Sequence, residues 1–86
     1  MGHIDTCLDS LRRLIAAGDT NSILLAEKAI DEYWAATPVP ALESGLRYVQ
    51  QIVVSIRDAA RGDKHSFADL VNDYIEKKLA DLSSRD

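Results

Sequence analysis

The apolar residues between Pro40 and Gly62 recur every three or four positions along the chain. Six of them follow one another at intervals of four, three, four, three and four: Leu42, Leu46, Val49, Val53, Ile56 and Ala60. This spacing places them on one side of a continuous helix, and Gly45, Ile52 and Ala59 widen the same stripe. Proline suits the first turn of a helix and glycine its end, so the pattern predicts a helix of about 22 residues.

Residues 49–56 of this segment also contain several β-branched side chains, which favour strands. The stretch lacks strict alternation of apolar and polar residues, and the helical spacing continues beyond it on both sides. Helix is therefore the predicted state, and a strand over residues 49–56 is the alternative that the sequence leaves open.

Two shorter helical patterns precede this segment. Residues 5–17 predict a first helix whose apolar side chains share one sector, and Gly18 supplies its end. The second predicted helix follows the capping sequence at residues 19–21 and extends to Ala36. Its main apolar stripe comprises Ile23, Ala26, Ile30, Tyr33 and Trp34.

Turn-forming residues separate the predicted helices. Prolines at positions 38 and 40 predict a stiff connector before the long helix. Residues 62–65 predict a turn, after which Ser66 begins a capping box for a fourth helix over residues 67–82. Residues 1–4 and 83–86 are expected to be flexible ends.

These patterns predict a single all-α domain over residues 1–86. Because short connectors join consecutive helices, the expected architecture is an antiparallel four-helix bundle with a short first helix and a long third helix. The third helix would exceed the first by about 13 Å at about 1.5 Å per residue. The first helix would then leave part of the long apolar stripe uncovered, and self-association as a two-fold homodimer would cover it.

Composition restricts the class of protein without identifying a function. The chain has 86 residues, of which 47% are hydrophobic and 28% charged, as in a globular domain with a modest core. Its net charge of −4 disfavours nucleic acid as a partner, because phosphate binding needs a concentrated basic face. The chain lacks an apolar run of roughly 18–20 residues, a signal-peptide pattern and a second cysteine. These features predict a cytoplasmic protein without membrane association.

The sequence predicts no catalytic, cofactor-binding or metal-binding arrangement. Cys7 lies on the apolar stripe of the first helix, where a cysteine behaves as a small hydrophobic residue. His65 is interpreted as a solvated turn residue, since the chain offers too few convergent ligands for a metal. Carboxylates four positions apart are interpreted as solvated helix faces: Glu27 with Asp31, and Asp69 with Asp73.

Function is predicted to depend on an exposed helical surface. The candidate interface residues are Leu24, Leu25, Tyr33, Trp34, Tyr48 and Val54. Aromatic anchors are where interface energy concentrates, although core packing is the alternative for Trp34 and Tyr48. We therefore expect a small acidic protein that binds a protein partner or regulates it, without catalysis. The alternatives are an immunity- or antitoxin-type inhibitor of a basic partner, a transcriptional regulator, and an enzyme that uses the paired carboxylates.

Overall fold

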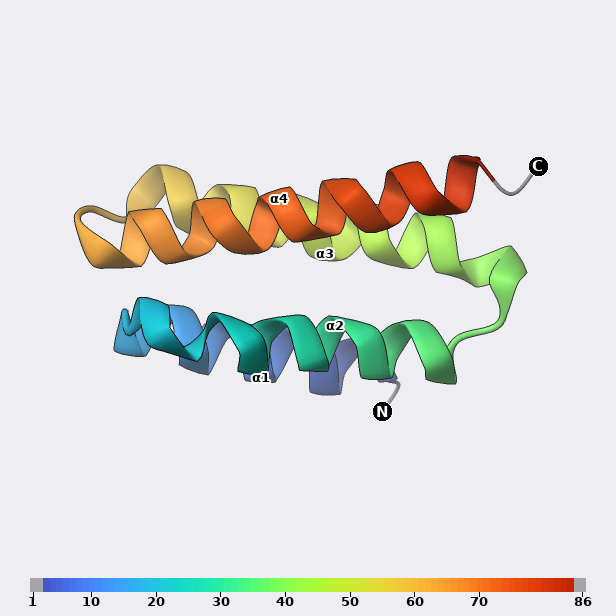
Figure 1. Ribbon diagram of the computed structural model, residues 1–86, viewed down its shortest axis with the longest axis horizontal. Helices are drawn as coiled ribbons and strands as arrows, with labels where there is room; N and C mark the ends of the chain where they lie inside the picture. Colours follow the sequence, from blue (N-terminus) through green and yellow to red (C-terminus); the bar gives the residue numbers. More distant parts are fainter. Residues whose placement is uncertain (1–2, 85–86) are drawn as a thin grey trace.

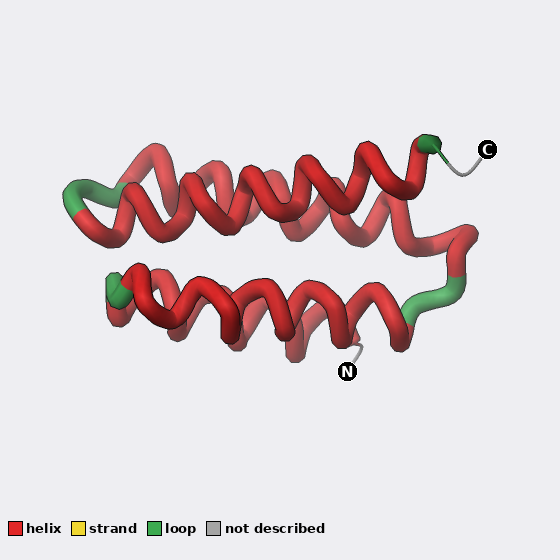
Figure 2. The backbone as a smooth tube through the Cα atoms, in the orientation of Figure 1, coloured by secondary structure: helices red, strands yellow, loops and turns green. Residues whose placement is uncertain are grey.

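The computed structural model describes residues 3–84. They form four α-helices: α1 (His3–Ala17), α2 (Ile23–Ala36), α3 (Val39–Ala59) and α4 (Asp63–Ser83). A short 3₁₀ helix, η1 (Thr20–Ser22), joins α1 to α2. No strand occurs among residues 3–84, so the all-helical prediction is confirmed and residues 49–56 are helical (Figure 2).

The helices pack as two pairs. α1 packs chiefly against α2, and α3 makes its most extensive contact with α4. The two pairs lie one above the other, with α2 against α4 and α1 against both α3 and α4 (Figure 1). The α1–α2 and α3–α4 connections lie at one end of the molecule, and the α2–α3 connection lies at the other end (Figure 1). α2 and α3 are thus consecutive in the chain without being principal packing partners.

The helices of each pair have matching lengths. α1 and α2 contain 15 and 14 residues, whereas α3 and α4 contain 21 residues each. The sequence correctly predicts a short first and a long third helix, but it places the fourth helix four residues too late. Because α4 is as long as α3 and packs along it, the apolar stripe of α3 is covered within the chain. Helix length therefore gives no reason for self-association.

One hydrophobic core lies between the two helix pairs. Its buried members are Cys7, Leu8, Leu11, Ile15, Ala26, Ile30, Tyr33, Leu42, Leu46, Val49, Val53, Phe67, Ala68, Val71, Ile75 and Leu79. Four of the six residues of the predicted α3 stripe belong to this core. Ile56 packs against it while partly exposed, and Ala60 lies beyond the end of α3.

The predicted turn at residues 62–65 is wrong in its position. Only residues 60–62 separate α3 from α4, so Asp63, His65 and the predicted cap Ser66 all lie within α4. The chain reverses at Gly62, whose φ of 64° is readily adopted only by glycine. Asp63 then occupies the first helical turn, where the helix dipole stabilises a negative charge.

The predicted flexible ends overlap the helices. His3 and Ile4 are the first residues of α1, and Ser83 is the last residue of α4. Residues 1–2 and 85–86, which complete these predicted ends, lie outside the described residues.

Gly45 on α3 leaves room for the side chain of Tyr33 on α2. A Cβ atom at position 45 would collide with the Tyr33 hydroxyl oxygen and would lie 3.0 Å from the ring carbon Cζ. Tyr33 is only 6% exposed, so the surrounding core limits movement of its ring. This close approach explains why a glycine stands in the middle of a long helix.

Gly45→Ala is therefore expected to lower the free energy of unfolding by roughly 1 kcal/mol. Overpacking costs about 1–3 kcal/mol, and the higher helix propensity of alanine offsets up to about 1 kcal/mol of that cost. Urea unfolding of Gly45→Ala in the wild-type and Tyr33→Phe backgrounds measures the effect. The substitution should cost less without the tyrosine hydroxyl, and an equal cost in both backgrounds would contradict this account.

Candidate functional site

The six residues predicted as an interface do not form one surface. Leu24, Leu25 and Tyr48 are 71%, 56% and 52% exposed. Trp34 and Val54 are half-buried. Tyr33 is buried in the core beside Gly45, as described above. Consecutive helical residues point about 100° apart, so even Leu24 and Leu25 face different sides of α2.

Leu25 lines a groove of about 340 Å³ between α1 and α2. Leu14 and Ala29 complete its apolar lining, and Lys28 and Glu32 are among the charged residues at its edge. Neither Lys28 nor Glu32 forms an ion pair or hydrogen bond with another described residue. The groove thus combines apolar contact area with two charges that have no ionic partner within residues 3–84.

A second hollow, of about 170 Å³, adjoins this groove. The two share Ser10, Ala29 and Glu32 as lining residues. The second hollow extends along α2 to Tyr33 and Ala36. The two hollows thus lie next to each other between α1 and α2, and together they are called the furrow.

Tyr48 lies elsewhere, in a hollow of about 450 Å³ between α1 and α3. Leu8 adds a second apolar side chain there, and Asp5, Asp9 and Arg12 surround them with charge. Asp9 already forms a 2.8 Å ion pair with an arginine one turn later on α1, at position 13. Tyr48 and Leu25 consequently belong to two separate surfaces on either side of α1.

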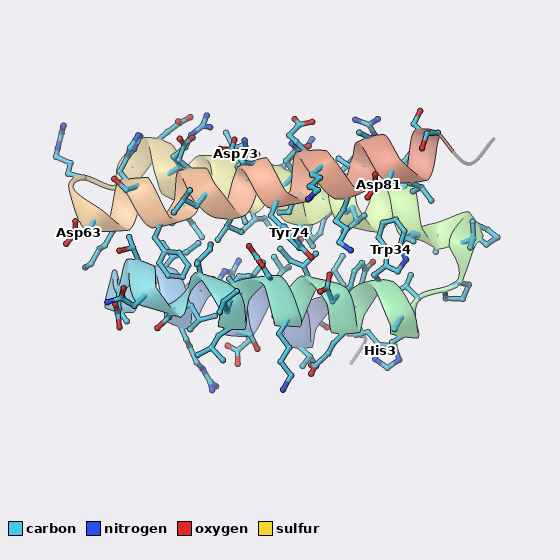
Figure 3. All side chains as sticks on the ribbon, in the orientation of Figure 1. His3, Trp34, Asp63, Asp73, Tyr74 and Asp81 are labelled. Atoms are coloured by element: carbon cyan, nitrogen blue, oxygen red, sulfur yellow. The ribbon has the colours of Figure 1, made fainter. Side chains whose placement is uncertain are left out.

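A polar cluster joins α2 to α4. The Tyr74 hydroxyl donates a 2.6 Å hydrogen bond to Asp31 Oδ1, and Lys78 Nζ lies 3.0 Å from the same oxygen. Lys78 Nζ also lies 5.2 Å from the ring centroid of Trp34 and 5.4 Å from that of Tyr74. Figure 3 shows both aromatic side chains in the space between the two helices. Trp34 therefore helps to hold α2 against α4.

Electrostatics fix the protonation states of this cluster at neutral pH. Burial raises the pKa of Asp31, but the hydrogen bonds from Tyr74 and Lys78 outweigh it, so the pKa lies below its usual value. The hydrogen bond to Asp31 raises the pKa of Lys78, whereas burial and the bond to Asp31 raise that of Tyr74. All three shifts favour the forms already present at neutral pH. The cluster is an interhelical contact between α2 and α4.

The sequence interpretation missed this cluster. It placed Asp31 on a solvated face together with Glu27, because the two lie one turn apart. The Asp31 side chain is half exposed, but it also meets a tyrosine 43 positions later in the chain. Helical spacing gives no signal for such a pair, because it defines the buried side of each helix but not which helix covers it.

A second polar seam links α3 to α4. The Arg57 guanidinium donates to Asp69 over 3.2 Å, and the Gln50 side chain donates to Asn72 over 3.2 Å. The His65 ring nitrogen Nδ1 lies 2.8 Å from the Arg57 carbonyl oxygen. A carbonyl oxygen only accepts, so Nδ1 is the donor, and His65 adds a second hydrogen bond to a carbonyl that already accepts from the Ala60 N–H. His65 is thus exposed to solvent, as the sequence predicts, but it lies within α4 and not in a turn.

Cys7 is buried, as its place on the apolar stripe predicts. Its side chain is 3% exposed, and burial raises the pKa of the thiol from 9.0 to about 11. The thiolate is the reactive form, so both access and ionisation are reduced.

The Cys7 thiol is accordingly expected to react slowly with a disulfide reagent in the native protein. A pKa raised by two units lowers the thiolate fraction about a hundredfold at pH 8, and burial slows the reaction further. Absorbance-monitored labelling in buffer and in concentrated urea gives the comparison. Equal rates in the two solutions would show that Cys7 is accessible in the folded protein.

Residues 3–84 contain no group of three or more histidine, cysteine, aspartate or glutamate side chains that could hold a metal ion. Among the helices of this part of the chain, none has the length and apolar character needed to cross a bilayer. No protein-family model, curated protein or solved structure matches the chain.

Proposed function

We propose that this chain is a small acidic cytoplasmic protein that binds or regulates other proteins through its helical surface and catalyses no reaction. The proposal rests on one observation: large apolar side chains that do not belong to the hydrophobic core are exposed to solvent. Leu24, Leu25 and Tyr48 are each more than half exposed. Leu25 and Tyr48 also line hollows with charged edges, the combination of apolar centre and polar rim found in protein interfaces.

The proposed architecture is an antiparallel four-helix bundle that self-associates as a homodimer. Its helix connections alternate between the two ends of the molecule (Figure 1). Closed two-fold symmetry is the commonest arrangement for an exposed patch that binds its own copy. Analytical ultracentrifugation at micromolar concentrations tests self-association, and a species at the monomer mass over the whole range would contradict it.

Position-specific crosslinking tests the interaction function. A photoreactive amino acid at Leu24, Leu25 or Tyr48 is expected to give discrete protein adducts in the cells that naturally express the chain. The matched control is the same amino acid at Asp73, an exposed polar position on α4. If the three apolar positions yield no more adducts than position 73, the proposed function is wrong.

A further inference from the structure

The furrow between α1 and α2 has an arrangement that a second copy of itself would complement. Leu25 stands at its first hollow, while Glu32 and Ala36 line its second. Lys28 and Glu32 lie one helical turn apart on α2, after Leu25 and before Ala36 in the chain. An apolar side chain, a cation, an anion and the second hollow thus follow one another along α2.

The two charges are placed to pair with another molecule. Lys28 and Glu32 have no ionic or hydrogen-bonded partner among the described residues, although they lie one turn apart. A lysine that precedes a glutamate by four residues is the less favourable order for a pair within one helix. A partner of a single charge would satisfy one of them and oppose the other, whereas a second copy brings one of each.

We propose that two copies of this chain associate through this furrow, across a two-fold axis level with the midpoint between Lys28 and Glu32. Such an axis makes every contact twice, so Lys28 of each copy faces the partner's Glu32. The two α2 helices then run antiparallel. Leu25 lies three residues before Lys28, so it comes to the level of the position three residues after the partner's Glu32. That point adjoins the partner's Ala36, so each Leu25 side chain enters the second hollow of the other copy.

The small side chain of Ala29 favours this arrangement. Ala29 lines both hollows and lies close to the level of the proposed axis. The distance between packed helices depends on the side chains at their contact, so an alanine there allows the two α2 helices to approach closely. This inference rests on the proposed function for self-association and adds the surface and the residue pairs.

Charge reversal provides a test that is specific to this pairing. Lys28→Glu places two acidic side chains opposite each other at both contacts, and Glu32→Lys places two basic ones there. Each variant alone is expected to dimerise about tenfold or more weakly than the wild type, measured by sedimentation equilibrium. An equimolar mixture of the two variants restores opposite charges at both contacts. Native mass spectrometry should therefore detect a heterodimer of the two, with an affinity close to that of the wild-type dimer.

Adjacent leucines provide the matched control for the apolar contact. Leu25→Glu should abolish the dimer, whereas Leu24→Glu changes a more exposed leucine that does not line the furrow and should leave the dimer intact. Circular dichroism should show the same helical signal in both variants. Equal effects of the two substitutions, or a variant mixture that forms no heterodimer, would overturn the proposed surface. A monomeric wild type would also overturn it, while crosslinks to a different protein would still support the proposed function.

Discussion

Replacing Val53 with aspartate is expected to unfold the protein at room temperature. Val53 is fully buried in the middle of α3, and the described core contains no buried polar or charged side chain that could pair with a carboxylate. Burying an unpaired charge costs several kcal/mol, and neutralising it by protonation still leaves a polar group without a partner. Small domains have about 5–15 kcal/mol of stability in total. We therefore expect loss of the far-ultraviolet helical signal, or a urea midpoint shifted close to zero.

Val39→Asp is the matched control on the same helix. Val39 is 66% exposed and is the first residue of α3, where a negative charge interacts favourably with the helix dipole. This substitution should change the free energy of unfolding by less than about 1 kcal/mol, with an increase favoured. A Val53→Asp variant that melts at the wild-type temperature would show that the α3 stripe is not the core.

The sequence predicts the helices and their buried sides well, because these depend on local periodicity. The residues of the α3 stripe from Leu42 to Val53 are buried as expected, and Cys7 is buried on α1. The error at the α3–α4 turn has a local cause too. The sequence pattern puts the end of the third helix at Gly62, whereas this glycine, with its φ of 64°, directly precedes α4. Ser66 and Asp69 resemble a capping box in sequence, but the helix already begins at Asp63.

The arrangement of the helices is less predictable from sequence. Periodicity defines which side of a helix is buried, but it does not define the helix that covers it. The sequence groups Tyr48 with Leu24 and Leu25 as candidate interface residues, yet Tyr48 lies in the hollow beside α1. The contact between Asp31 and Tyr74 similarly depends on α2 meeting α4.

The candidate site is the least predictable part. Exposure of Leu24 and Leu25 follows from their positions off the α2 stripe and is confirmed. The furrow beside Leu25 depends on how α1 lies against α2. That Lys28 and Glu32 have no ionic partner among the described residues can be known only from the folded structure. The identity of a partner depends on a surface that belongs to another molecule, so the sequence predicts an interaction protein without naming what it binds.

Phe67→Ala is expected to lower the free energy of unfolding by about 3–5 kcal/mol, the usual cost of truncating a buried phenylalanine. Phe67 is completely buried, and it is the largest of the fully buried side chains among the described residues. For a domain of this size, about 1 kcal/mol shifts the melting temperature by about 4–8 °C, so the fall should exceed about 12 °C. Calorimetry or thermal circular dichroism measures it.

Leu70→Ala serves as the control for Phe67→Ala, because Leu70 lies on the same helix and is 44% exposed. Its truncation should cost less than about 1.5 kcal/mol, since much of its side chain remains in water.

The comparison also tests the start of α4. If the helix began at Phe67, this residue would lie at a fraying helix end and its truncation would cost little. Because α4 begins one turn earlier, at Asp63, Phe67 is held within the helix and against the core. A loss of stability for Phe67→Ala no larger than that for Leu70→Ala would contradict both its burial and this helix boundary.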